Sequence, residues 1–393
     1  MSKLKPARLL LSLALLFALA PAAAAQTVSA KVVPNWQNPG VAQAEARRAL
    51  ASLPDSQAVL FVNASRVINE VLPRVMPPAD YAKMLNDARK VGFDARGVDY
   101  VAVVARLADP PPANNLPDFA VVIGGNFNAD ALLALGRVAA GAQNISPRSE
   151  TYGSKTLEII DLESLNKKPE AAAGAAGEGD GNPPKPMPYP EVAVMALNAN
   201  TLVAGVPSYV RALVDAAGGR GALKPSMVDL ATRDRQALWS LTVELPPNLY
   251  EHLRKAGAPS NQEAEQMIGW VKQFSLAQGM DALNYTMSAS VLTDAPEHAS
   301  AFSGLVRMGM LAAQTGLNSE AAKQTPKHKD YARTRAMLDA MKTFVNRTEG
   351  NTLLLSASFP QKAVHDLFKK EMAGPKAAQP AAKPAPRRRT RRR

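Results

Sequence analysis

The residue types that most often carry out chemistry in proteins are sparsely placed in this sequence. Ser164 and Lys167 have the S-x-x-K spacing of penicillin-recognising enzymes, but the surrounding Ala, Gly and Pro residues predict no helix to hold the two side chains together. The histidines stand alone, with no pair at metal-binding helix spacing and no cysteine to join them, at His252, His298, His328 and His365. The sequence therefore predicts no catalytic centre, no metal site and no cofactor.

Two other patterns offer binding surfaces. Gly124-Gly125-Asn126 lies between a predicted strand and a helix and could present backbone amides to an anion, although a simple turn with glycines at positive φ is the plainer interpretation. A stripe of hydroxyl groups on alternating strand positions could face a ligand, a partner or the rest of the chain, and ordinary solvent-facing positions are the plainer interpretation here. The stripe consists of Ser240, Thr242, Thr286, Ser288, Ser290, Ser356 and Ser358.

The most specific feature is the C-terminal segment GPKAAQPAAKPAPRRRTRRR. Its Ala and Pro residues favour extended polyproline-type geometry, and its guanidinium groups predict a salt-sensitive contact with a polyanion. A solubilising end with no partner is the alternative. The predicted contact residues are Arg387, Arg388, Arg389, Arg391, Arg392 and Arg393.

The positive charge is concentrated at the two ends of the chain. The formal net charge is +12, of which residues 1–25 carry +3 and residues 375–393 carry +8, leaving +1 for the rest. The body of the protein is therefore nearly neutral, and attraction to polyanions belongs to the tail. Sequence-specific nucleic-acid binding is not expected.

The N-terminus has the three regions of a secretory signal peptide. Lys3, Lys5 and Arg8 precede an apolar run over residues 9–20, which is shorter than the ~20 residues that a bilayer-spanning helix needs. Cleavage is predicted between Ala25 and Gln26, after an Ala-x-Ala pattern. We expect a periplasmic or secreted protein whose mature chain has no transmembrane span, and the absence of cysteine excludes a lipid anchor and disulfides.

Strand, tight turn and helix recur along the chain. Apolar runs predict strands over 98–107 and 119–123, and YGSK predicts the turn of a hairpin within 151–162. In the second half, apolar side chains alternate with hydroxyls, as at Trp239 and Ser240. This alternation predicts an antiparallel sheet with helices on its apolar face and a wetter surface opposite.

Capping boxes predict two helices in the second half. Ser260-x-x-Glu263 opens one with Met267, Ile268, Val271 and Phe274 inward. Asp294-x-x-Glu297 opens the other, and its predicted inward residues are Phe302, Leu305, Val306 and Gly309.

Three short segments recur in the same order in the two halves of the chain. The pairs are Asp55-Ser-Gln57-Ala58 with Asp234-Arg-Gln236-Ala237, Gly97-Val-Asp99 with Gly279-Met-Asp281, and Asn200-Thr-Leu with Asn351-Thr-Leu. The order predicts an internal duplication.

The fold class predicted is α+β, as two related repeats that each have a mostly antiparallel sheet with helices packed on it. The predicted organisation is a signal peptide over 1–25, a first domain over 26–220, a second over 221–374 and a disordered Arg-rich tail over 375–393. Residues 166–190, which are Ala, Gly and Pro with scattered charges, are predicted to form a disordered surface loop.

A resemblance follows from the leader together with LPDSQAVLFVNASRV at residues 53–67 and the Pro-containing turns of the later units. In organisation, the chain resembles exported bacterial proteins from families with no assigned activity. The resemblance implies export and brings no functional residues with it.

The sequence favours a non-enzymatic exported envelope protein whose body is tethered by the basic tail to an anionic polymer or surface. The alternative is a periplasmic ligand-binding module that uses the groove between the two repeats. A hydrolase with dispersed carboxylates is the most distant possibility, and it requires a pocket with strongly perturbed carboxylates.

Overall fold

A computed structural model describes most of the chain between its two termini. The described residues are 39–90, 92–107, 117–142, 145–162, 189–220, 222–234, 236–246, 249, 262–325 and 331–365. The predicted signal peptide, residues 166–188 of the predicted loop at 166–190, and the arginine tail lie outside these ranges.

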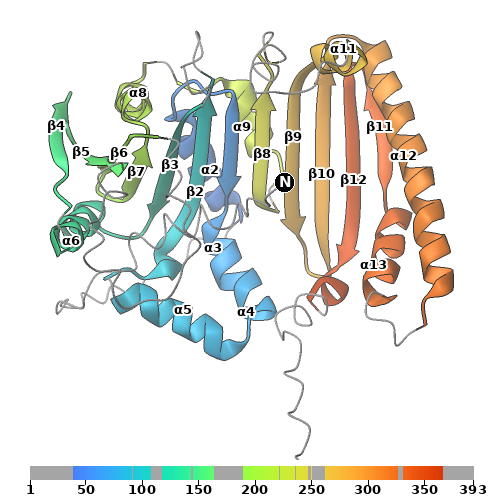
Figure 1. Ribbon diagram of the computed structural model, residues 1–393, viewed down its shortest axis with the longest axis horizontal. Coiled ribbons are helices and arrows are strands. Elements are labelled where there is room, and N and C mark those ends of the chain that lie inside the picture. Colours follow the sequence, from blue (N-terminus) through green and yellow to red (C-terminus); the bar gives the residue numbers. More distant parts are fainter. Residues whose placement is uncertain are drawn as a thin grey trace, which may run out of the picture.

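All named strands belong to one 12-stranded sheet in which every neighbouring pair is antiparallel. The order is β11-β12-β10-β9-β8-β1-β2-β3-β7-β6-β5-β4 (Figure 1). The predicted antiparallel sheet with packed helices is therefore confirmed. The strands are β1 Ala58–Val62, β2 Val98–Arg106, β3 Asp118–Gly125, β4 Arg148–Tyr152, β5 Lys155–Asp161, β6 Glu191–Asn198, β7 Thr201–Gly205, β8 Ala237–Glu244, β9 Val271–Met280, β10 Asn284–Thr293, β11 Val345–Glu349 and β12 Thr352–Pro360.

Helices lie on the sheet and around its ends. In Figure 1, α3, α4 and α5 run along one end of the strands, and α12 flanks the edge strand β11. Among the described residues, no helix is both long and apolar enough to cross a bilayer. The helices are α2 Pro39–Ala51, α3 Ala64–Arg66, the π-helical turn η2 Val67–Val71, α4 Leu72–Val75, α5 Pro78–Lys90, the 3-10 turn η3 Ala95–Gly97, α6 Ala129–Ala142, α8 Pro207–Ala217, α9 Pro225–Ala231, α11 Gln262–Trp270, α12 Pro296–Lys323 and α13 Tyr331–Lys342.

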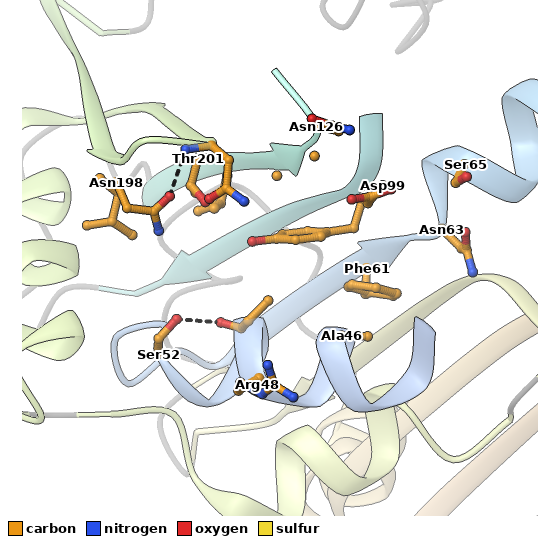
Figure 2. Close-up of a pocket in the computed structure, with 17 residues that line it drawn as sticks. Ala46, Arg48, Ser52, Phe61, Asn63, Ser65, Asp99, Asn126, Asn198 and Thr201 are labelled. Atoms are coloured by element: carbon orange, nitrogen blue, oxygen red, sulfur yellow. Dashed lines mark hydrogen bonds between the residues drawn. The ribbon is translucent and has the colours of Figure 1, made fainter. Parts of the chain in front are cut away.

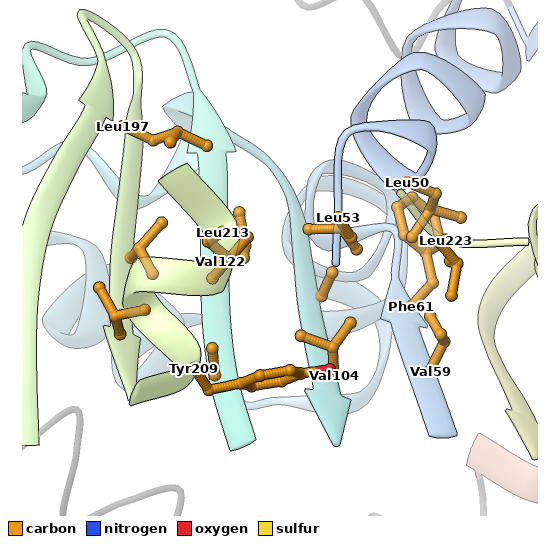
Figure 3. Close-up of a cluster of buried hydrophobic side chains, with 14 of the residues drawn as sticks. Leu50, Leu53, Val59, Phe61, Val104, Val122, Leu197, Tyr209, Leu213 and Leu223 are labelled. Carbon is orange, nitrogen blue, oxygen red and sulfur yellow. The ribbon is translucent and has the colours of Figure 1, made fainter. Parts of the chain in front are cut away.

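The largest core lies between the first strands and the helices α2, α8 and α9. Leu50 on α2, Tyr209 and Leu213 on α8, and Met227 on α9 are fully buried against strand residues such as Val104 (Figure 3). We call the sheet surface that carries Val104 the α2 face. The α2 face continues from β1 onto β8 in the second half of the chain, because Phe61 pairs with Ser240 and Val59 pairs with Thr242.

Tyr209 links this core to the segment before β1. Its ring is buried, and its hydroxyl contacts Ser56 Oγ and donates to the carbonyl of Asp55. Burial raises the pKa of Tyr209 to about 12, and the hydrogen bond to Ser56 opposes this rise.

This raised pKa predicts a loss of stability in strong base. Because the folded pKa lies above the unfolded value near 10.0, the stabilisation is complete below pH 10 and is lost as the pH rises to about 12. The loss should be roughly 3 kcal/mol, at about 1.4 kcal/mol per pKa unit. Urea unfolding at both pH values should show a smaller loss for Tyr209→Phe than for the wild type, whereas parallel losses would contradict the assignment.

The prediction of which face is buried was wrong for β8, although Tyr285 on β10 and Leu353 on β12 are buried as apolar residues. Ser240 and Thr242 are 2% and 0% exposed, whereas Trp239, Leu241 and Val243 are only partly buried. The hydroxyl side of β8 continues the α2 face and lies beneath α9, where Ser240 donates to the carbonyl of Ala231. Packing of β8 beside β1 and beneath α9, and not the polarity of its residues, therefore determines which face of this strand is buried.

The two predicted capped helices also differ from expectation. α11 ends at Trp270, and the residues expected on its inner side at Val271 and Phe274 belong to β9. α12 begins at Pro296 after Ala295, which makes no side-chain cap, and Asp294 instead binds His298. The outward-facing part of α12 includes Leu305, which is 44% exposed, and Gly309.

The predicted hairpin within 151–162 was confirmed. β4 and β5 form the expected hairpin, with Tyr152 paired to Lys155 and Gly153 at positive φ between them. One continuous sheet contains strands from both sides of the predicted boundary near residue 220, because β8 pairs directly with β1.

Candidate functional site

A cavity of about 570 Å³ opens on the α2 face at one end of the first strands. We call it the Asn pocket, after the four asparagines that line it. Its apolar lining includes Phe61, Val122 and Leu197. Its polar lining consists of Arg48, Ser52, Asn63, Ser65, Asp99, Tyr100, Asn126, Asn198, Asn200 and Thr201 (Figure 2).

Sheet order explains why these residues meet. β1, β3 and β6 end at this edge of the sheet, while β2 and β7 begin there, because the order β1-β2-β3-β7-β6 is antiparallel throughout. Residues at the strand ends therefore converge from distant parts of the chain. Helix α2 supplies Arg48, and the turn that follows it supplies Ser52, on the opposite side of the opening from the β6–β7 turn with Asn198 (Figure 2).

Tyr100 crosses the floor of the pocket. It pairs with Gly124, which pairs with Thr201 on the next strand, and the Tyr100 hydroxyl is hydrogen-bonded to the Thr201 side chain. A Cβ at Gly124 would lie 2.3 Å from the Tyr100 ring, so only glycine leaves room for this arrangement. Burial raises the pKa of Tyr100, while the hydrogen bond to Thr201 lowers it, and the phenol therefore stays neutral at physiological pH.

The pair Gly124-Gly125 was expected to be a turn with positive φ, and this expectation was wrong. Both residues belong to β3, and neither is among the described glycines with positive φ. Gly125 is required for a different reason, since a Cβ there would lie 2.2 Å from the carbonyl oxygen of Gly97. The backbone of η3 thus packs directly on the end of β3, and Asn126 N–H donates to the same Gly97 oxygen.

Asn126 and Asn200 present unused amides at the opening. Both are exposed, and within the described ranges neither side chain makes a hydrogen bond. Their backbones are fixed, because Gly125 N–H donates to the carbonyl of Asn200 and Asn200 N–H donates to Asn198 Oδ1. Each amide offers one acceptor and two donor hydrogens at a defined place on the rim.

Charge is balanced around the pocket. Among the residues that the structure describes, Arg48 is the only cationic one that lines it and Asp99 the only anionic one. Phe61 and Tyr100 stack at 6.0 Å with an interplanar angle of 21° and add an aromatic wall. The site is therefore suited to a neutral, polar ligand with an apolar side. It contains no nucleophile paired with a histidine, since its described lining includes no histidine.

The predicted hydroxyl stripe is divided by the structure. Ser240 and Thr242 are buried in the core, and Thr242 Oγ1 has no hydrogen-bond partner in the described protein. Ser288, Ser290 and Ser356 line a second hollow of about 570 Å³ between α9 and β11. Ser290 is hydrogen-bonded to Ser275 across the strand pair, so part of this polar surface is already satisfied internally.

The histidines that can be placed lie away from the Asn pocket. His298 Nδ1 is 2.6 Å from Asp294 Oδ1, and its ring stacks on Trp270 at 4.1 Å. His365 Nε2 is 2.9 Å from the Tyr285 hydroxyl. His252 and His328 lie outside the described residues, as do Ser164, Lys167, the cleavage site at Ala25 and Gln26, and the tail arginines.

The asparagines of the pocket were missed by sequence reasoning, apart from Asn126. The usable signal was an asparagine directly after three apolar runs of the sequence, at Asn63, Asn126 and Asn198. The predicted groove between the two halves stays a prediction. The Asn pocket is lined by residues between 46 and 201, and the second hollow by residues between 230 and 356, so each of these two falls within one predicted half of the chain.

Comparison with known proteins adds a distant likeness only. No protein-family model matches the chain, and no curated protein has a similar sequence. Structures of crystal forms III, I and IV of TP0453 align over 82% of this chain and 96–98% of theirs, at 8–9% identity and TM-scores of 0.36–0.37. These TM-scores are too low to support an argument about shared function.

Proposed function

We propose that this is a non-enzymatic exported protein that binds a small neutral polar ligand in the Asn pocket. The supporting observation is the convergence of Asn126, Asn200 and Tyr100 at one open end of the sheet. The two amides lack hydrogen-bond partners within the described protein, while their backbones are held in place. A concave site with fixed polar groups above an apolar base is the usual form of a small-molecule site.

A ligand screen by thermal shift tests this function. The wild type and an Asn126→Ala/Asn200→Ala variant should melt alike without ligand, because neither side chain supports the described fold. Sugars, amino acids, nucleosides and organic acids would be screened at millimolar concentration, since binding to the folded state raises the melting temperature.

The matched control is Asn318→Ala, at an exposed position on α12 far along the chain from the pocket. At least one compound class should raise the melting temperature of the wild type and the control by a few degrees but leave the double variant unchanged. If no class protects the wild type, or all three proteins are protected equally, the pocket does not have this function.

We also propose a second role for the tail, as a tether to an anionic envelope polymer or surface. The specific observation is that residues 375–393 carry +8 while residues 26–374 carry only +1. A guanidinium cluster of this kind binds polyanions through counterion release. Export and a periplasmic or secreted location are part of this proposal, which is supported by the N-terminal charge and apolar pattern.

We infer further that the two halves arose by duplication. Outward from the central pair, β1-β2-β3-β7-β6 and β8-β9-β10-β12-β11 follow the same succession of strands. Ala58 and Ala237 begin β1 and β8, but Gly97 precedes β2 whereas Gly279 lies near the end of β9, so that pair of segments does not correspond. Superposition of the two five-strand units in a crystal structure tests the inference, and poor superposition would remove it.

A further inference from the structure

The Asn pocket has features that narrow its ligand to one chemical class. We propose that it takes a neutral saccharide unit, an inference that rests on the proposed binding function and goes beyond it by naming the ligand. Three features of the pocket favour such a ligand: the charge of its lining, the polar groups at its opening and its aromatic wall.

Charge disfavours ionic ligands. Among the described lining residues, Arg48 is the single cation and Asp99 the single anion. A cationic ligand would be repelled by Arg48 and an anionic ligand by Asp99, and no second residue of the same sign reinforces either charge. Sites for phosphate or carboxylate normally cluster cations or helix N-terminal amides. A lining of opposite single charges and many neutral groups instead fits an uncharged molecule.

The neutral groups match adjacent hydroxyls. A carboxamide places an acceptor oxygen beside a donor nitrogen, and a sugar hydroxyl both donates and accepts. Asn126, Asn200 and the buried Thr201 hydroxyl lie at the ends of the neighbouring strands β3 and β7. Neighbouring strands are spaced by about 4.8 Å, which lets two rim groups reach hydroxyls on one sugar ring.

Sugar binding also requires an apolar surface for the ring, and the aromatic wall of the pocket supplies it. A pyranose has an apolar surface of C–H groups that packs against an aromatic ring, and Phe61 and Tyr100 form the stacked aromatic pair of this pocket. Aromatic residues make up only 5% of the chain, so this pairing is not an effect of composition. The volume of about 570 Å³ lies within the range of about 300–1,000 Å³ typical of small-ligand pockets.

Isothermal titration calorimetry of the full mature chain with defined sugars tests the proposal. The probes are glucose, N-acetylglucosamine and their β-1,4-linked disaccharides, with glucuronate and glucosamine as charged comparisons and zwitterionic alanine as a non-saccharide comparison. At least one neutral sugar should bind at millimolar affinity or better. Its carboxylate or ammonium relative should bind about tenfold more weakly, because each meets Asp99 or Arg48.

Variants locate the binding. Asn126→Ala/Asn200→Ala should weaken sugar binding by about tenfold or more through loss of two polar partners, while Asn318→Ala leaves it unchanged. Gly124→Ala should abolish it, because the new Cβ displaces the Tyr100 ring that lies 2.3 Å away. Circular dichroism establishes whether Gly124→Ala is folded, and the double variant decides the question if it is not.

The outcomes separate this inference from the broader function. If no sugar binds but alanine or another screened compound protects the wild type and not the double variant, the pocket binds a ligand and the saccharide assignment is overturned. Sugar binding that is equal in the wild type and the double variant overturns it as well. Sugar binding that depends on Asn126 and Asn200 supports both the broader ligand-binding function and the saccharide assignment.

Discussion

Gly125→Ala should destabilise the protein by about 3 kcal/mol or more, at the upper end of overpacking effects. The added Cβ would lie 2.2 Å from the Gly97 oxygen, 2.8 Å from Val98 Cα and 2.9 Å from Asp99 N. All three atoms belong to the backbone, so no side-chain rotation relieves the clash. Gly125 also pairs with Val98, and separating the two backbones would break the β2–β3 ladder near its end.

The matched control for this substitution is Gly309→Ala. Gly309 lies within α12, and its added Cβ would have no atom within 4 Å. Alanine there should stabilise the helix by up to about 1 kcal/mol, because it has the higher helix propensity. Urea unfolding curves of both variants give the comparison. A Gly125→Ala protein with a wild-type midpoint would mean that η3 and β3 do not pack in this way.

The same glycines show what sequence reasoning could reach. The strand before Gly124 was predicted because its apolar run is a local pattern, and the 151–162 hairpin was predicted because YGSK is a local turn signal. The reason for the glycines is not local. Tyr100 must pass over Gly124, and Gly97 must approach Gly125. Both contacts depend on the β2–β3 register, which no single segment encodes.

The buried face of β8 was mispredicted for a related physical reason. Alternation in Trp239, Ser240, Leu241 and Thr242 shows that two faces differ, but polarity alone cannot say which one another element will cover. Pairing with β1 places Ser240 in line with Phe61, beneath α9. Ser240 meets the cost of burial by bonding to a helix carbonyl, whereas Thr242 Oγ1 finds no partner in the described protein.

The Asn pocket was beyond sequence reasoning because its parts come from five separate segments of the chain. Asn63, Asn126 and Asn200 are each ordinary residues for a strand end or turn. They come together only through the strand order β1-β2-β3-β7-β6. In this order β7 pairs with β3, although β4, β5 and β6 lie between these two strands in the sequence. That insertion is a property of long-range packing, and no repeat or spacing in the sequence signals it.

Removal of residues 375–393 should abolish polyanion binding while leaving the fold intact. The segment contains only Ala, Pro, Gln, Thr, Lys and Arg, so it has no large apolar side chain to bury. We therefore expect the melting temperature to change by no more than about 1 °C, since surface changes away from packed features are nearly neutral. The remaining chain loses eight positive charges and with them its excess of positive charge.

Salt dependence identifies the source of the binding. For a duplex DNA probe, affinity falls with a log–log slope of about −0.9 for each phosphate neutralised. If six to eight cations of the tail engage, the full mature chain should lose about a thousandfold or more between 50 and 200 mM salt. Fluorescence anisotropy with labelled DNA, and sedimentation with an anionic envelope polymer, measure this loss.

Replacement of the six tail arginines by lysine provides the matched control. The charge is kept but the bidentate guanidinium fork is lost, so the lysine variant should retain the salt slope and bind several-fold more weakly. The substitutions are at Arg387, Arg388, Arg389, Arg391, Arg392 and Arg393. If the truncated protein binds as tightly as the full mature chain at low salt, the contact lies on the nearly neutral body, and the tether proposal fails.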